Sequence, residues 1–361
     1  MKEIVIGGRR IGGTNPAFIV AEVSANHQQK IENAIAIIRA AAEAGADAVK
    51  LQTYTPDTIT IDSRQPWFFV GGEKNKDNPE VWHGKTFHDL YKEAYTPWEW
   101  HAELQRVVQE LGLIFFSTPF DPTAVDFLEK LNVPCYKVAA YECTDITLLR
   151  RIAKTKKPVI MSVGFATLPE IELSVKTLRD GGVKEIAILH CLTSYSAKHI
   201  AEATNLRTIA DLRDRFDVVA GLSENMGGIE APIIATAMGA SIIEKHLVVA
   251  HDPKILDDQF SLDVKEFKEM VRRIRLQEEM AGVVKYGPQT PQEEANRRYR
   301  RSLFVVQDIK KGEKFTAENF RSIRPADGLE TKYYDNVLGK KAMRDIPRGT
   351  PLSWELVEGG K

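Results

Sequence analysis

The chain has 361 residues, more than a typical single domain, which predicts one large domain followed by a small one. Its formal net charge of −1, with 27% charged residues, gives no support to binding of nucleic acid or of a membrane surface. No apolar stretch approaches the ~20 residues that span a bilayer, and the N-terminus lacks the apolar core of a signal peptide. The three cysteines lack C-x-x-C spacing, which argues against disulfides and structural zinc. We therefore expect a cytoplasmic protein.

Strand-like and helical patterns alternate along most of the chain. Residues 3–12 read as a β-hairpin around Gly7-Gly8, and the alternating part follows it up to about Ala281. The predicted strands are residues 18–23, 47–52, 113–117, 135–140, 158–163, 185–191, 217–222 and 241–246. Helical patterns include residues 31–44, 98–111, 123–131, 168–181, 228–239 and 264–281.

Eight strands that alternate with helices are typical of an α/β protein whose parallel sheet closes into a (β/α)₈ TIM barrel. The hairpin is then expected to plug the bottom of the barrel. A doubly wound open sheet is the alternative, but no G-x-G-x-x-G motif follows the first strand. Residues 54–96 form a long insertion after the second strand, and loops of this length at the carboxyl face of a barrel usually line or cover a substrate site.

The character of the sequence changes after the barrel. We predict domain boundaries at 1–282 for the barrel with its hairpin, 283–298 for a linker and 299–361 for a small, mostly β domain. Residues 308–312 (DIKKG) and 345–349 (DIPRG) echo each other, which indicates two related β-turn units in this domain.

Polar residues appear where several of the apolar strands end. Glu22, Lys50 and Lys137 lie in or at the ends of predicted buried strands, where a charge without a partner costs several kcal/mol. Ser117-Thr118 ends the third strand, and His246 ends the eighth. Because the carboxyl ends of barrel strands meet at one face, these side chains are expected to converge on a shared polar site.

The two lysines allow three interpretations. Either lysine can act as a Schiff-base nucleophile, since desolvation lowers the pKa of an amine. Alternatively, Lys50 and Lys137 remain charged and together bind a doubly anionic ligand such as a phosphorylated carboxylic acid. The structural alternative is a buried ion pair, for example of Lys50 with Glu22 or Glu142.

Carboxylates and hydroxyls complete the candidate chemistry. Glu22, Glu142 and Glu244 are candidate acid or base groups, although Glu244 can instead point outward, because strand alternation places it opposite Lys245. Ser223 follows the seventh strand, where barrel enzymes often bind phosphate. His246 is a lone histidine without metal-motif spacing, so a structural or acid–base role is open beside metal binding.

These residues resemble the sialic acid synthase family, and its pseudaminic acid synthase branch in particular. The matching stretches are residues 21–27 (AEVSANH), 44–53 (AGADAVKLQT), 117–120 (STPF), 136–137 (YK), 221–223 (GLS), 243–246 (IEKH) and 260–263 (FSLD). The branch resemblance rests on residues 84–86 (GKT) and 90–101 (LYKEAYTPWEWH) in the insertion. Residues 299–361 resemble the antifreeze-like (SAF) domain of these enzymes, with RSL at 301–303 and IRP at 323–325.

The resemblance implies a condensation of phosphoenolpyruvate with an N-acetylated amino sugar in its aldehyde form, releasing phosphate and giving a nonulosonic acid. It implies that Glu22 stabilises the cationic state at C2, that His246 takes part in catalysis, and that Lys50 and Lys137 hold phosphoenolpyruvate. The further substrate contacts that it implies are Gln52, Thr118, Glu142, Tyr195, Ser223, Asp257 and Arg324. It also implies a divalent ion, Mn²⁺ or Mg²⁺, no organic cofactor, and a domain-swapped homodimer in which Arg324 acts in trans.

The departures from the family pattern fall at positions that, by the resemblance, bind the metal and phosphoenolpyruvate. The family's Ser-Asp-His, whose histidine binds metal, is here Ser223-Glu224-Asn225, so His246 would share the ion with an amide, a weak donor. Ala140 replaces a serine, and residues 191–196 read CLTSYS instead of a Cys-Thr-x-x-Tyr-Pro pattern. Besides an ordinary synthase, these changes leave open a synthase that works with little or no metal and a diverged paralogue that only binds the sugar.

Overall fold

The chain divides into two compact units, Met1–Gly282 and Val283–Lys361. The computed structural model describes residues 2–71, 78–196 and 200–360. Each unit has its own hydrophobic core, so each is considered separately below.

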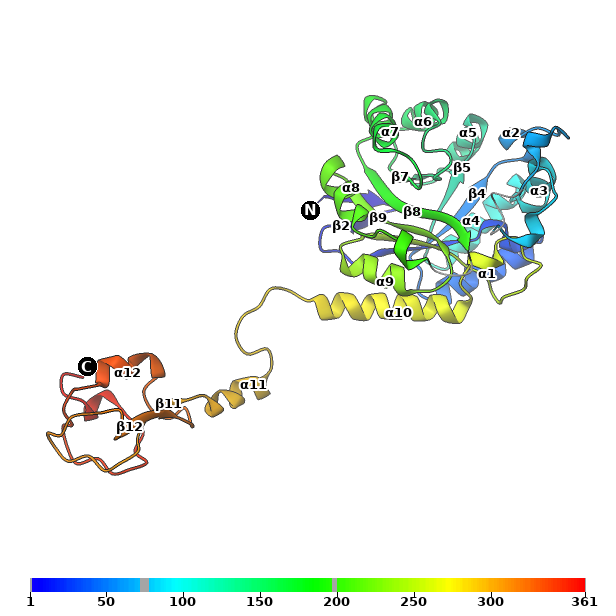
Figure 1. Cartoon of the computed structure of the whole chain (residues 1–361). Coiled ribbons are helices and arrows are strands. Elements are labelled where there is room, and N and C mark those ends of the chain that lie inside the picture. The colour runs from blue at the N-terminus through cyan, green and yellow to red at the C-terminus, as the bar shows by residue number, and fades with distance from the viewer. Residues whose placement is uncertain (1, 72–77, 197–199, 361) are drawn as a thin grey trace. The chain divides into compact units, whose positions relative to one another are not determined.

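Eight parallel strands of the first unit close into a barrel in the order β10-β3-β4-β5-β6-β7-β8-β9 (Figure 1). The strands are β3 Phe18–Glu22, β4 Ala48–Thr53, β5 Ile114–Pro119, β6 Tyr136–Val138, β7 Val159–Ser162, β8 Ile186–Ser196, β9 Val219–Met226 and β10 Ile242–His246. Pairing between β10 and β3 closes the sheet, with His246 opposite Glu22. The predicted (β/α)₈ barrel is therefore confirmed, and the open sheet is excluded.

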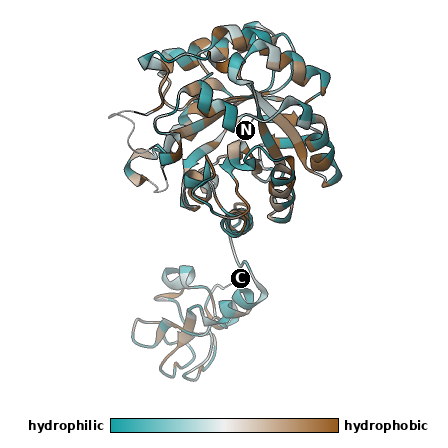
Figure 2. Cartoon of the chain, turned by 90° about the vertical axis from the view of Figure 1, so that its right-hand side faces the viewer, coloured by the Kyte–Doolittle hydropathy of each residue, from teal (hydrophilic) through white to brown (hydrophobic). Residues whose placement is uncertain are grey.

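Helices cover the outer face of the barrel strands. They are α1 Ile31–Glu43, α4 His101–Glu110, α5 Pro122–Lys130, α6 Ile146–Ala153, α7 Leu168–Asp180, α8 Thr208–Phe216, α9 Glu230–Ala237 and α10 Val264–Ala281. Their apolar faces pack on outward-facing strand residues such as Ile19, Val49 and Ile243, and this contact forms the larger hydrophobic core. In Figure 2 several barrel strands are coloured mainly brown, while the helices carry teal stretches.

The N-terminal hairpin packs against the inside of the barrel. Strands β1 Glu3–Ile6 and β2 Arg9–Gly12 pair antiparallel around Gly7 and Gly8, which have φ of 56° and 84°, values that glycine adopts without strain. Ile4, Ile6 and Ile11 are buried in one cluster with inward-facing residues of the strands. The hairpin therefore closes the barrel interior on the amino-terminal side of the strands, as the sequence predicts.

The insertion after β4 is tied down at several points. It contains α2 Pro56–Ile59, η2 Pro66–Phe68, η4 Glu80–Trp82 and α3 Phe87–Ala94, and it runs into η5 Trp98–Trp100 before α4. Residues 72–77 of the insertion lie outside the described part of the chain. The indole N–H of Trp82 donates to the carbonyl of Leu256 at 3.0 Å, and Trp98 donates to the carbonyl of Tyr54 at 3.1 Å. The insertion is thereby anchored beside the carboxyl ends of the strands.

The second unit begins with the predicted linker, which is partly helical. It contains α11 Pro291–Asn296, capped by Thr290, and η8 Arg297–Tyr299, because a Thr-x-x-Glu capping box and a proline at the first turn favour a helix start. The small β domain then has β11 Ser302–Val305 paired with β12 Phe320–Ile323, followed by η9 Thr331–Tyr333, α12 Tyr334–Val337 and η10 Trp354–Leu356. The two echoed turn units pair with each other through Ile309 and Ile346.

The helices and the cysteines bear on two of the expectations from the sequence. Within residues 2–71, 78–196 and 200–360, no helix combines the length and the apolar character that crossing a bilayer requires. The three cysteines, Cys135, Cys143 and Cys191, are buried free thiols.

Two fully buried histidines link the barrel to the end of the insertion and to the segment that follows it, and burial favours their neutral form. His27 Nδ1 accepts from the backbone N–H of Gln29 at 3.1 Å, and its Nε2 lies 3.2 Å from Thr96 Oγ1. His101 Nδ1 lies 3.2 Å from the carbonyl of Pro97, and its Nε2 lies 2.9 Å from the Thr53 hydroxyl. Burial lowers the pKa of both rings to about 4, and His101 adds to the effect on His27.

We predict from these pKa values that the protein loses stability as the pH falls below 6.5. Between the ordinary pKa of 6.5 and the folded value near 4, the unfolded chain binds more protons than the folded one, so the free energy of unfolding decreases with falling pH. The loss at pH 5 relative to pH 8 is expected to be about 2 kcal/mol for each histidine. Urea unfolding at a series of pH values measures it. His101→Asn should flatten the curve, His83→Asn on the surface should not, and an unchanged slope in H101N would contradict the assignment.

Candidate active site

The inward-facing residues of the barrel strands change from apolar to polar near the carboxyl ends of the strands. On seven of the eight strands, one inward-facing residue is apolar or glycine, and the residue two positions later carries a charge or a hydroxyl. On β8 that later residue is a cysteine. The steps are Val20 to Glu22, Ala48 to Lys50, Phe116 to Thr118, Cys135 to Lys137, Ile160 to Ser162, Leu189 to Cys191, Gly221 to Ser223 and Ile242 to Glu244. We call these eight carboxyl-side residues the polar layer. Because strand side chains alternate with period two, all eight face the barrel interior, and they gather near the carboxyl ends of the strands.

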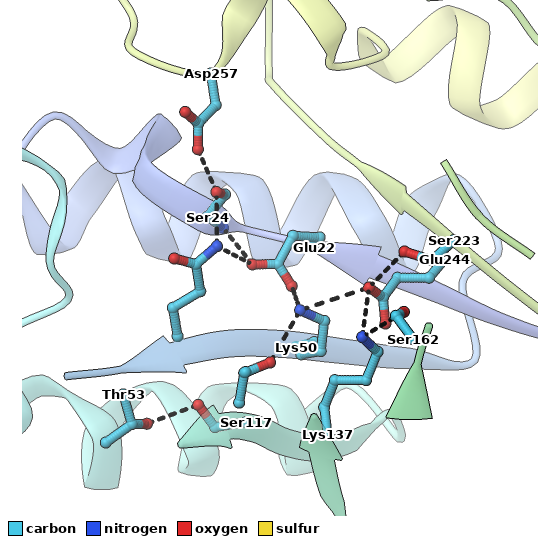
Figure 3. Close-up of polar contacts among 12 residues, drawn as sticks. Glu22, Ser24, Lys50, Thr53, Ser117, Lys137, Ser162, Ser223, Glu244 and Asp257 are labelled. Atoms are coloured by element: carbon cyan, nitrogen blue, oxygen red, sulfur yellow. Dashed lines mark hydrogen bonds and ion pairs between the residues drawn. The ribbon is translucent and has the colours of Figure 1, made fainter. Parts of the chain in front are cut away.

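A chain of alternating charges runs through the polar layer (Figure 3). Lys50 forms an ion pair with Glu22, and its Nζ also lies 3.6 Å from Glu244 Oε1. The same Glu244 oxygen lies 3.5 Å from Lys137 Nζ, so one carboxylate oxygen joins both lysines. All four side chains are at most 7% exposed, so the ion pairs are protected from solvent screening.

Hydroxyl groups complete the coordination of these charges. Lys50 Nζ donates to Thr118 Oγ1 at 3.2 Å, and Lys137 Nζ donates to Ser162 Oγ at 2.8 Å and to the carbonyl of Val138 at 3.2 Å. Ser223 Oγ donates to Glu244 Oε1 at 3.1 Å. Each ammonium group therefore has three oxygen neighbours, matching its three N–H donors.

The surroundings favour a charged Lys50 over a Schiff-base nucleophile at that position. Burial acts to lower the pKa of Lys50, but Glu22 and Glu244 outweigh it and hold this pKa above its usual value. Burial lowers the pKa of Lys137, and Glu244 opposes that effect. For Glu244, burial acts to raise the pKa, but Lys137 and Lys50 bring it below its usual value. The buried ion pair of Lys50 considered from the sequence exists, with Glu22 rather than with Glu142.

The interpretation in which Glu244 points outward is wrong. On β10, Glu244 faces the barrel interior, and the next residue, Lys245, faces the helices. Lys245 Nζ pairs with Glu224 of β9 at 3.2 Å and also donates to the carbonyl of Met226, with both charged side chains fully buried. The alternation of strand side chains predicts that the two residues face opposite sides of the sheet, and they do. The sequence alone does not specify which of them faces inward.

A second group of polar contacts lies beyond the polar layer. Glu22 Oε1 accepts from the backbone N–H of Ser24 at 3.1 Å and from Gln52 Nε2 at 3.2 Å. Ser24, which adopts the left-handed φ of 50°, donates its hydroxyl to Asp257, and Gln52 Nε2 donates to Ser24 Oγ at 3.0 Å. Asp257 also accepts from the backbone N–H of Ala25 at 3.2 Å. Glu22, Gln52 and Asp257 are thus brought together through Ser24.

Aromatic rings border this group on the side of β8. Tyr195, at φ 47°, packs 5.0 Å from Phe260 and 5.4 Å from Trp82, measured between ring centroids. Phe260 contacts the ring of His246 at 4.9 Å, so these rings connect the end of β10 with the insertion. The carboxylate of Glu142, after β6, is mostly buried, and burial raises its pKa to about 7.

The residues at the proposed metal position do not fit a tightly held divalent ion. His246 and Asn225 are both buried, on adjacent strands, and His246 Nδ1 has no hydrogen-bond partner among the described residues. However, His246 belongs to no group of three His, Cys, Asp or Glu side chains with gathered donor atoms in the described part of the chain. Burial lowers the pKa of His246 far below its usual value, and Lys50, Lys245 and Lys137 contribute, so the surroundings are positive. One group with suitable donors, His251, Asp263 and Glu266, lies at the surface.

One predicted site residue, Arg324, belongs to the second unit. Arg324 follows β12 in the second unit and is exposed. The remaining predicted residues lie at or near the carboxyl ends of the barrel strands. Sequence reasoning assigned no role to Ser24 or Ser162. A signal for Ser162 was available, because it ends the apolar run of β7 as Thr118 ends β5.

Known proteins resemble this chain along nearly its whole length. Residues 37–286 match the NeuB family, and residues 300–358 match the SAF domain. The pseudaminic acid synthase of Campylobacter jejuni is 40% identical over 335 residues, covering 93% of this chain and 95% of that protein. The pseudaminic acid synthase of Helicobacter pylori is 39% identical, covering 95% and 98%. The crystal structure of an N-acetylneuraminic acid synthetase from Leptospira borgpetersenii, in complex with citrate, is 31% identical, with a TM-score of 0.69, covering 82% and 96%. This chain therefore belongs to the NeuB family and carries a C-terminal SAF domain.

Proposed function

We propose that the protein is a nonulosonic acid synthase of the pseudaminic type, which condenses phosphoenolpyruvate with an acetamido sugar aldehyde and releases phosphate. The observation that carries the proposal is the pair of buried lysines, Lys50 and Lys137, joined by one carboxylate oxygen at the carboxyl face of the barrel. The synthases that resemble this chain over more than nine-tenths of its length support it.

The lysine clamp, defined as Lys50 and Lys137, is suited to an anion with two charged groups. Phosphoenolpyruvate carries a phosphate and a carboxylate, and two fixed ammonium groups attract both. Thr118, Ser162 and Ser223 lie beside the clamp, and their hydroxyl groups can donate to substrate oxygens. Both amines already have oxygen neighbours, which hold them in place when substrate binds.

Glu22 is proposed to support the carbon chemistry. In the proposed reaction, C3 of phosphoenolpyruvate attacks the aldehyde carbon, the new C–C bond leaves positive charge at C2, and water adds there before the C2–O bond to phosphate breaks. A buried carboxylate next to C2 stabilises the cationic state, because its charge acts in a low dielectric. The Ser24 N–H, Gln52 and Lys50 hold the Glu22 carboxylate in position.

The sugar is proposed to lie over Gln52 and Asp257, between the insertion and the aromatic rings. Asp257 is buried and accepts from Ser24 and Ala25, so its carboxylate is oriented before any sugar hydroxyl arrives. Glu142 and Tyr195 offer a further acidic group and a ring at the same end of the barrel. His246 contributes a neutral imidazole there, because its pKa lies far below neutrality.

Phosphate release from phosphoenolpyruvate, assayed with a panel of acetamido sugars, tests the function. Glu22→Gln is expected to slow release by at least about 100-fold, the usual effect of removing one transition-state electrostatic contact. Phosphoenolpyruvate should still bind to E22Q in calorimetry, because both lysines remain. Glu32→Gln, on the exposed face of α1, is the matched control and should keep wild-type rates. A wild-type protein that neither binds nor consumes phosphoenolpyruvate would overturn the proposal.

A divalent ion at His246 and Asn225 is proposed to bind weakly. When bound, such an ion would polarise the sugar aldehyde as a Lewis acid. Asparagine replaces the second imidazole, so Asn225→His should raise Mn²⁺ affinity by at least about tenfold. Titration calorimetry with Mn²⁺ alone measures this without turnover. The double variant N225H/H246A should lose the gain, and tight stoichiometric Mn²⁺ binding by the wild type would contradict the prediction.

Arg324 is proposed to complete the site of a second copy of the chain in a domain-swapped homodimer, as the family resemblance implies. E22Q and R324A are then each expected to be nearly inactive. Mixing them under conditions that exchange subunits should restore activity to about a quarter of the wild-type value, because half of the dimers regain one intact site. A monomer by light scattering, or mixed dimers without recovered activity, would remove Arg324 from the site.

A further inference from the structure

Glu244 occupies the centre of the lysine clamp, although the proposed reaction gives it no role. Its Oε1 accepts from Ser223 and lies 3.5 Å and 3.6 Å from the two ammonium nitrogens. We propose that Glu244 is a positioning residue, an inference that rests on the proposed function. Its carboxylate acts as an internal anion that holds the two lysines between turnovers and competes with substrate and with product phosphate for the clamp. Figure 3 shows the carboxylate between Lys50, Lys137 and Ser223.

The contacts of Glu244 are those that an oxygen of a bound anion would make. Two ammonium groups and a serine hydroxyl converge on one carboxylate oxygen, which is the donor set that phosphate and carboxylate ligands use in proteins. The second oxygen, Oε2, is buried and has no hydrogen-bond partner among the described residues. The Glu244 carboxylate is therefore held by one oxygen only, which leaves it freer to withdraw than a bidentate partner.

Electrostatic repulsion is the reason that a bound anion would displace the Glu244 carboxylate. Two glutamates alternate with the two lysines, so an anion that enters the clamp meets two carboxyl groups as well as two amines. A substrate with a phosphate and a carboxylate adds two or more negative charges at the same place, and like charges in a buried site repel strongly. Anion binding therefore requires Glu244 to move out from between the lysines, and its return favours release of product phosphate.

The lysines do not depend on Glu244 alone for their positions. Lys50 keeps Glu22 and Thr118 as partners, and Lys137 keeps Ser162 and the carbonyl of Val138. Replacing Glu244 by glutamine therefore leaves each lysine with hydrogen-bond acceptors, retains an acceptor for Ser223, and removes the carboxylate charge.

The experiment compares wild type and Glu244→Gln in the full-length protein, by calorimetry with inorganic phosphate and by steady-state kinetics. We expect E244Q to bind phosphate roughly tenfold more tightly, a small part of what Coulomb's law gives for charges about 4 Å apart at a dielectric constant near 20. The KM for phosphoenolpyruvate and kcat should both fall, because product phosphate leaves more slowly. A residue that only supported the fold would raise KM.

Glu224→Gln is the matched control, because it breaks the other buried Lys–Glu pair, on the outward face of the same two strands. It should lower the melting temperature without tightening phosphate binding. A crystal structure of the wild type with phosphate tests the proposal even if E244Q does not fold. Phosphate oxygens should then replace Glu244 between the two lysines.

The outcomes separate the inference from the proposed function. A wild type that consumes phosphoenolpyruvate, together with an E244Q variant that binds phosphate equally or more weakly, overturns the inference alone. So does a phosphate complex in which Glu244 still bridges the lysines. A wild type that neither binds nor consumes phosphoenolpyruvate overturns both.

Discussion

The site depends on the requirement that charges inside a closed barrel be paired. Once eight strands close, the polar layer is surrounded by the hairpin and the apolar inner residues on one side and by the insertion on the other. In such surroundings an isolated ammonium group would cost several kcal/mol, so Lys50 and Lys137 persist only because Glu22 and Glu244 alternate with them. The same arrangement preorganises the two lysines, because their ammonium groups have partners before any ligand arrives.

This arrangement is weak evidence for stability and stronger evidence for function. Buried ion pairs often stabilise a fold less than apolar residues of similar volume would, because desolvation offsets most of the attraction. The outward pair of Glu224 and Lys245 serves packing between β9, β10 and the helices, and no proposed chemistry uses it. The inward charges have partners on several strands, and one carboxylate shared between two lysines is a poor structural optimum but a suitable anion site.

The sequence predicted the barrel well because its signal repeats: each apolar run ends in a polar residue, and glycines cap several helices. Residues such as Lys50 and Lys137 stand out since lysine is rare in buried parallel strands. Glu244 was ambiguous because two charged neighbours, Glu244 and Lys245, fit either face of a strand until barrel closure fixes the register. Ser24 was invisible for another reason. Its role comes from a left-handed backbone turn and from a contact 233 positions away, and neither leaves a pattern in the local sequence.

The polar layer and its rim are built by different kinds of contact, and this separates the chemistry from the choice of substrate. Strand register fixes the layer, so a change there disturbs the whole barrel. The rim is assembled from loops: Trp82 of the insertion reaches Leu256 by a hydrogen bond and Tyr195 and Phe260 by ring packing. Loops tolerate substitution and insertion far better than strands do. Proteins that share the layer can therefore differ in the insertion and in the loop after β10, while the lysines of the layer keep their places.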